Sequence, residues 1–173
     1  MANCTTTQSY VLPCRNNTGG VNVVYIADFS DKGTPTLSAT SGTVTAWSDA
    51  AGDFYTIQCR PEVASSTFNA TMNDANGTTV YGHSVSFTLE QLSGNRNVEN
   101  DILAKGRFLI MIKDNNGKYF VLGYTNGMRC SGMENGTGTA NGDLNGTKFT
   151  FTSNEPFPAY EVDSTIVAAL LAP

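Results

Sequence analysis

The sequence predicts a mostly β protein, an antiparallel β-sandwich with one short flanking helix at about residues 97–105. Glycine, asparagine, threonine and serine are abundant and only 14% of the residues are charged, a composition typical of strands joined by tight turns. Several segments alternate apolar and polar residues or form short apolar runs between turns, and both patterns indicate β-strands. Only one segment has a clear helix pattern.

A length of 173 residues suits one domain with a full hydrophobic core. We therefore expect a single domain over residues 1–173, with an N-terminal arm at residues 1–18 and a C-terminal arm at residues 156–173. Pro156 and Pro158 prevent continued sheet pairing where the second arm begins. No apolar stretch matches a signal peptide or a membrane span, so we expect a soluble protein made in a cytosol, with no membrane partner.

Three strands are expected in the first third of the chain. Residues 21–29 are a β-branched run, and residues 42–47 form a second, shorter strand. Residues 54–60 alternate as a half-buried strand does, which places three side chains on the packed face: Tyr55, Ile57 and Cys59.

A long hairpin is expected next, with residues 63–72 and 79–91 as its two strands. The second strand carries a face of large side chains that we expect to be the contact between copies of the chain: Tyr81, His83, Val85, Phe87 and Leu89. Long strands with few charges and no proline pair readily with strands of another chain. An oligomer whose sheets continue from subunit to subunit would satisfy them.

The predicted helix at residues 97–105 has Asn95 or Asn97 as its N-terminal cap and Gly106 as its end. Residues 107–113 form a continuous apolar run, which indicates a central strand covered on both faces. The turn that follows leads into residues 119–124, and together these segments predict a hairpin.

The last part of the chain is less regular. Residues 131–146 are rich in Gly, Asn and Thr and are expected to form a loop, and residues 147–152 alternate as a strand. Residues 165–171 fit either a last strand or a short helix.

The residue types that carry catalysis are scarce. The single histidine, His83, lies in the middle of the aromatic strand face, so a packed or interface histidine is favoured over a catalytic base. Carboxylates are scattered, and neither a nucleophile elbow nor a phosphate-binding loop is present in the sequence. We expect no enzyme activity, no catalytic residue and no cofactor.

The four cysteines contain no C-x-x-C pair, so a zinc site is not expected. Cys59 and Cys130 are expected to be reduced and buried, whereas Cys4 and Cys14 are candidates for a bridge in an oxidising setting. Three D-x-N-G elements fit hairpin turns better than calcium loops. The loop at residues 141–145 is the remaining calcium candidate.

The formal charge of −5 and the pI of about 4.7 come without any run of Lys or Arg. A chain of this kind has no basic patch with which to hold phosphate backbones, so we do not expect a dedicated nucleic-acid binder. An acidic surface would instead let nucleic acid pass without sticking, because like charges repel.

Three stretches carry a resemblance to a known family: the strand after Gly19 and Gly20, the hairpin at residues 108–123, and the loop and strand at residues 137–155. In this order of elements the chain resembles the tail tube proteins of tailed bacteriophages, and more closely the tube-like and neck-ring proteins of phages that infect Bacteroidetes, including the crAss-like phages. The resemblance implies a β-sandwich of tail-tube type. Residues 63–89 match the family's long hairpin between rings by position and length.

The resemblance also implies a function. Such subunits form a hexameric or dodecameric ring with a lumen through which DNA passes as transient cargo, next to other tail, ring or portal proteins of the virion. The chain would then be located in the tail or neck of the virion, after assembly in the cytoplasm of the bacterial host. No catalytic, cofactor or metal residue is implied. The alternative is a secreted or surface carbohydrate-binding β-sandwich, which would account for the aromatic residues and the Asn/Asp loops.

Overall fold

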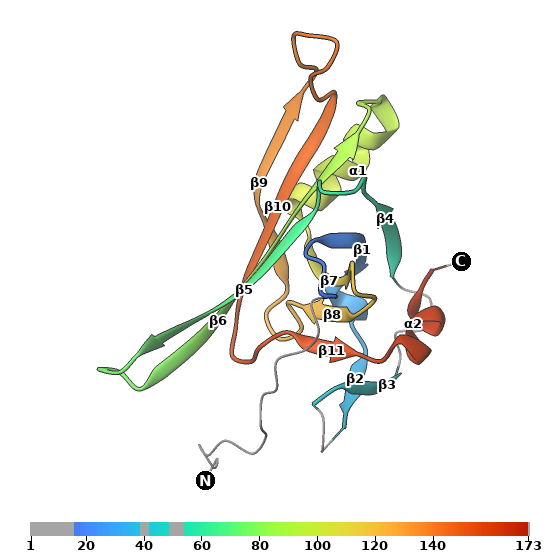
Figure 1. The fold of residues 1–173 in the computed structure, drawn as a ribbon. Helices are drawn as coiled ribbons and strands as arrows, with labels where there is room; N and C mark the ends of the chain where they lie inside the picture. Colours follow the sequence, from blue (N-terminus) through green and yellow to red (C-terminus); the bar gives the residue numbers. More distant parts are fainter. Residues whose placement is uncertain (1–15, 39–41, 49–53, 173) are drawn as a thin grey trace.

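The computed structural model describes residues 16–38, 42–48 and 54–172, which form a β-sandwich with two short α-helices (Figure 1). The mostly β fold class is confirmed. In order, the elements are β1 (Val21–Asp28), a 3-10 turn (Phe29–Asp31), β2 (Thr34–Leu37), β3 (Val44–Ser48), β4 (Tyr55–Gln58), β5 (Ser65–Asn73), β6 (Thr78–Glu90), α1 (Gly94–Lys105), β7 (Arg107–Asp114), β8 (Tyr119–Leu122), β9 (Met128–Gly136), β10 (Gly146–Glu155), β11 (Tyr160–Val162) and α2 (Ser164–Leu170).

The sheet folds over on itself at β7. One layer contains β4, β1, β7, β8, β11, β3 and β2, and the other is the four-stranded sheet β9-β10-β6-β5. The two layers are joined where Arg107 and Phe108 of β7 pair with Arg129 and Met128 of β9. Beyond these two pairs β9 separates from β7, and the four-stranded sheet crosses the body of the protein diagonally (Figure 1).

Two hydrophobic cores lie on the two faces of β7. Ile110 and Ile112 point into the first core, between the layers, while Leu109 and Met111 point into the second core. All four are buried. The prediction that this strand is covered on both faces is confirmed.

The expected C-terminal arm is instead part of the fold. β10 ends at Glu155, directly before Pro156, but the chain then forms β11 and α2. Val167 and Leu170 of α2 are buried in the second core. Backbone hydrogen bonds from Phe54 to Leu170 (3.0 Å) and from Ala172 to Phe54 (2.8 Å) fix the end of the chain. The apolar run after Pro158 is buried because it covers the second face of the central layer.

Helix α1 begins three residues before the predicted start. Its N-terminal cap is Ser93, whose side chain accepts a hydrogen bond from the Arg96 amide, and neither Asn95 nor Asn97 caps it. Serine caps a helix as well as asparagine does, so residue type alone did not separate the candidates. The helix ends at Gly106 as predicted.

Part of the expected loop at residues 131–146 is a strand. Residues 131–136 belong to β9, which pairs along β10 with one irregularity between Thr150 and Phe151 of β10. The residues of β9 from Gly132 onward are exposed, so their side chains lack the apolar alternation that marks a half-buried strand. Residues 137–145 form the remaining loop.

The packed face predicted for residues 54–60 is confirmed for Ile57 and Cys59, which pack against the first core, but not for Tyr55. Tyr55 is 68% exposed, while its neighbour Phe54 is fully buried against Trp47 in an edge-to-face contact of 6.0 Å between ring centroids. Phe54 forms a parallel bridge with Leu171, which turns its side chain toward the second core. Most of the expected N-terminal arm, residues 1–15, lies outside the described residues, and Thr18 is held by the Asn116 side chain.

Candidate assembly surface

The side chains expected to join copies of the chain lie inside it. Val85 and Phe87 are fully buried, and His83 is 3% exposed. Val85 and Phe87 belong to the first core, between the layers, and Tyr81 and Leu89 are only partly exposed. The alternation identified a packed face, but that face packs against β7 and β10 of the same chain, so it is not a free contact surface.

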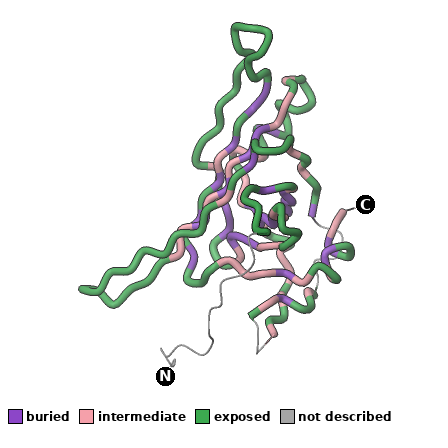
Figure 2. The backbone as a smooth tube through the Cα atoms, in the orientation of Figure 1, coloured by how far each residue is buried: buried purple, intermediate pink, exposed green. Residues whose placement is uncertain are grey.

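The hairpin of β5 and β6 projects beyond the body of the protein. β10 pairs with β6 only as far as the pair Glu155 and Tyr81, whereas β5 and β6 continue together to Asn73 and Thr78. This projecting part is exposed (Figures 1 and 2). It nevertheless carries apolar side chains, since Met72 is 71% and Val80 is 40% exposed.

Strand β5 forms one free edge of the four-stranded sheet. It is the last strand in the order, so its outer backbone groups have no ladder partner among the described residues. Its nine residues, Ser-Ser-Thr-Phe-Asn-Ala-Thr-Met-Asn, contain neither a charged residue nor a proline. Natural proteins protect edge strands with charge, proline or bulges, so an edge of this kind is suited to pair with another strand.

Strand β9 forms the opposite free edge. Its pairing with β7 covers Met128 and Arg129 alone, so residues 130–136 are paired on the β10 side only. The same four-stranded sheet therefore ends in two long edges, and both belong to strands that extend past the body (Figure 1).

The face of this sheet that points away from the body is polar. Ser84, Ser86, Thr150 and Thr152 occupy its centre, in positions that alternate with the buried side chains. Its charges balance, with two basic and two acidic residues: Arg129, Lys148, Glu90 and Glu134. The net acidity of the chain is therefore not located on this face.

A buried polar cluster lies at the start of the projecting hairpin. Glu155 is buried, and its carboxylate accepts hydrogen bonds from the amides of Thr125 (2.9 Å) and Asn126 (3.0 Å) and from the Ser153 hydroxyl (2.6 Å). His83 Nδ1 accepts a hydrogen bond from the Gly123 amide at 3.4 Å, while Nε2 has no hydrogen-bond partner among the described residues.

This cluster holds a histidine, a serine and a carboxylate, but not in the geometry of a catalytic triad. Ser153 donates to Glu155 instead of to His83, and all three residues are buried. A nucleophile requires a base within hydrogen-bond reach and access for its substrate. The arrangement instead ties the turn between β8 and β9 to the end of β10.

Burial lowers the pKa of His83 below its usual value, while the nearby charge of Glu155 and the nearby Phe157 backbone oppose this shift. As the pH falls, His83 is therefore protonated at a higher pH in the unfolded chain than in the folded chain. The stability that neutral His83 contributes is complete above about pH 6.5, the ordinary value for histidine, and is lost as the pH falls toward the lowered pKa.

We expect urea denaturation to show a loss of stability between pH 7 and pH 5 that is smaller in His83→Gln, because glutamine does not titrate. An equal loss in both proteins would mean that carboxylates, and not His83, determine the response.

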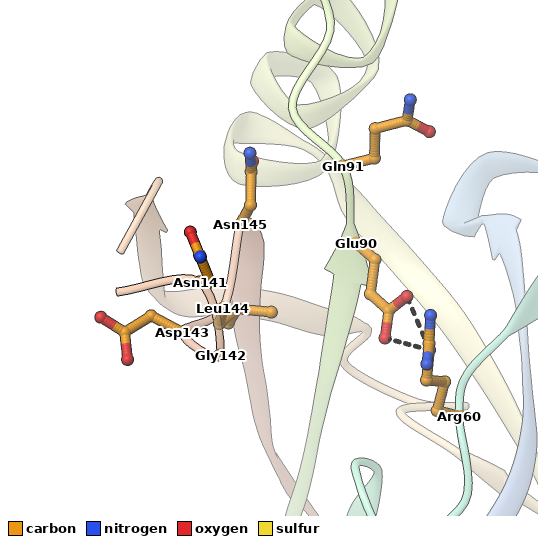
Figure 3. A pocket seen from close by; sticks show the side chains of 8 residues that line it. All are labelled: Arg60, Glu90, Gln91, Asn141, Gly142, Asp143, Leu144 and Asn145. Carbon is orange, nitrogen blue, oxygen red and sulfur yellow. Dashed lines mark hydrogen bonds and ion pairs between the residues drawn. The ribbon is translucent and has the colours of Figure 1, made fainter. Parts of the chain in front are cut away.

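The calcium candidate at residues 141–145 lines an open hollow of about 700 Å³ together with Arg60 and Glu90 (Figure 3). Asp143 points away from these two residues. Its Oδ2 atom accepts hydrogen bonds from the Thr139 amide and hydroxyl and from the Ala140 amide. These bonds lower the pKa of Asp143 and shape the loop.

Calcium binding at this loop remains an untested alternative to a simple turn. No group of three metal-ligating side chains is found in the described parts of the chain.

In the part of the chain that the structure describes, the rings around Trp47 do not form a flat platform for a sugar ring. Trp47 packs edge-on against Phe54 and Tyr124, and the Lys32 ammonium lies 4.7 Å from the centre of the Tyr124 ring. The exposed rings of Tyr55 and Phe157 lie on β4 and in the segment before β11.

Cys59 and Cys130 are half-buried free thiols. Burial raises the pKa of Cys59, which favours its protonated, unreactive form. Cys4 and Cys14 lie outside the described residues.

No helix in the described residues is long and apolar enough to cross a membrane. No protein-family model matches the chain, and comparisons with curated proteins and with solved structures give no match.

Proposed function

We propose that this protein is a structural component of a phage tail or neck, where copies of it assemble into a closed ring or tube. The observation that carries the proposal is the free edge of β5, which is nine residues long and has no charge or proline to block pairing. Pairing with another copy satisfies its backbone groups, and closure into a ring leaves no edge exposed.

The wall of the lumen would be the polar face of the four-stranded sheet. Its hydroxyl groups are neutral and its four charges cancel. DNA can move along such a wall because no cluster of cations holds its phosphates. The body of each subunit would then face outward, toward neighbouring proteins of the tail, the neck ring or the portal.

Assembly is tested with the purified full chain by size-exclusion chromatography with light scattering and by negative-stain microscopy. We expect closed rings or tubes of six or twelve copies per ring. A chain that remains monomeric at every concentration, and that melts at a higher temperature in the presence of sugars, would instead support the carbohydrate-binding alternative.

The double substitution Thr67→Lys with Asn69→Lys places two cations on the exposed edge strand β5. We expect loss of most of the ring fraction, because like charges on the edge disfavour strand addition, while the monomer keeps its fold.

The matched control is Thr152→Lys with Asn154→Lys. These residues lie on the same face but on β10, an inner strand, and they are exposed as well. The control adds the same charge without touching an edge, so rings should persist. If both double variants lose the ring fraction equally, the added charge on the lumen face, and not the β5 edge, would be the cause.

A further inference from the structure

We infer that β5 of one copy pairs antiparallel with β9 of the next copy, in a register that places Phe68 opposite Met133. The inference rests on the proposed function, and it names the partner edge and the residues that meet. It combines the direction of the strands, the pleat of the sheet, the tilt of a closed barrel and the exposure of two side chains.

The direction of the strands permits this pairing between copies. Neighbouring strands are antiparallel throughout β9-β10-β6-β5. With four strands, the two edges run in opposite directions, so the β9 edge of a second copy continues the antiparallel order beside β5. Each copy then adds the same four strands, and rotation about one axis can close the sheet.

The two edges are offset along the sheet. Their positions can be compared by the residues of β6 that lie beside them, here called levels. β5 pairs with residues 78–86 of β6. β9 pairs with the part of β10 that itself pairs with residues 84–90 of β6. Side-by-side pairing without a shift would use only the levels that the two strands share. A shift of four to six residues instead brings the whole free edge of β9 against β5.

The alternation of side chains between the two faces of the sheet excludes a shift by an odd number of residues. On β5, Phe68 lies level with the buried His83, and on β9, Met133 lies level with the buried Phe149 and Phe87. Both side chains therefore point to the body side of the sheet. A shift by an odd number of residues would place body-side residues opposite lumen-side residues, so only shifts of four or six remain.

The tilt of the strands agrees with these two shifts. A shift of four residues corresponds to about 13 Å along the strands, and four strands span about 19 Å across them. The resulting tilt is about 35°, and a shift of six residues gives about 46°. Closed barrels have tilts of about 35–45°, so a shift of four lies within this range and a shift of six at its upper limit.

Side-chain chemistry selects the shift of four. Phe68 and Met133 are large apolar side chains, each 40% exposed in the single chain. A shift of four places them directly opposite one another, where the thioether can contact the ring. A shift of six would place Phe68 opposite the polar Asn135.

The test is disulfide cross-linking of Phe68→Cys with Met133→Cys, in a full-length chain whose four native cysteines are replaced by alanine. Within one chain the two positions are about 19 Å apart, counting four levels and three strand spacings, so a bond can form only between copies. After mild oxidation of assembled protein, we expect the monomer band to be lost in favour of a ladder that ends at the ring size.

Two matched pairs complete the test. Thr67→Cys with Met133→Cys places the thiols on opposite faces and should stay monomeric on the denaturing gel. Ala70→Cys with Met133→Cys reports a shift of six. Rings that cross-link through this last pair, or through none of the pairs, would overturn the inference and leave the proposed assembly standing. A protein that forms neither rings nor cross-links would overturn both.

Discussion

Replacement of Phe87 by alanine is expected to lower the free energy of unfolding by about 3–5 kcal/mol. The Phe87 side chain is fully buried, and its ring centre lies 5.7 Å from those of both Phe149 and Phe151. Loss of the ring removes its apolar surface from the first core and leaves a cavity that the two remaining rings can fill only in part. Urea denaturation followed by circular dichroism measures the change.

Phe157→Ala is the matched control, because Phe157 is largely exposed and should change stability by no more than about 0.5 kcal/mol. The loss in Phe87→Ala should also be independent of protein concentration, since its contacts lie within one chain. A loss that disappears on dilution would restore the role in subunit contact that the sequence suggested for this face.

The alternation in residues 79–91 predicts a strand with one packed face, and the structure confirms this. It does not say what the face packs against, because the interior of a chain and the contact between two chains are both apolar. That answer depends on β7 and β10, which are distant in sequence and lie beside the face only once the sheet has folded over.

Local sequence patterns also do not predict which strands lie at the edges of the sheet. The lack of charge in β5 is visible in the sequence, but its place at the edge depends on the order of all strands. β9 is hidden for a further reason: apart from Met133, its outer residues are small or polar, and they are exposed, so they resemble a loop. Only its ladder with β10 makes this segment a strand.

Glu155 has no sequence signal at all. It is a single carboxylate directly before Pro156, in no motif, and it becomes important because the turn between β8 and β9 folds over it. The neighbouring glycines of this turn, Gly123 and Gly127, both have positive φ, which explains their residue type. The donors that this turn presents to Glu155, the amides of Thr125 and Asn126, could not be inferred from spacing.

Replacement of Glu155 by alanine is expected to cost about 3–5 kcal/mol of stability. The substitution leaves the amides of Thr125 and Asn126 and the Ser153 hydroxyl without their acceptor. Hydrogen bonds to a charged group contribute about 1.5–3 kcal/mol each, and the buried Ser153 hydroxyl would add a desolvation cost. We expect faster amide exchange at Thr125 and Asn126, together with the loss of stability in urea.

Asp143→Ala is a close chemical control for this substitution. Asp143 also accepts two amide hydrogen bonds and one from a hydroxyl, but it lies on an exposed loop. Water can replace its carboxylate, so its loss should lower the stability far less than the loss of Glu155 does. The two carboxylates accept hydrogen bonds from the same kinds of donor, so a difference between the two losses of stability would reflect their burial. Equal losses in the two variants would show that burial of Glu155 does not set the cost, and that the turn before β9 is held by its backbone without the carboxylate.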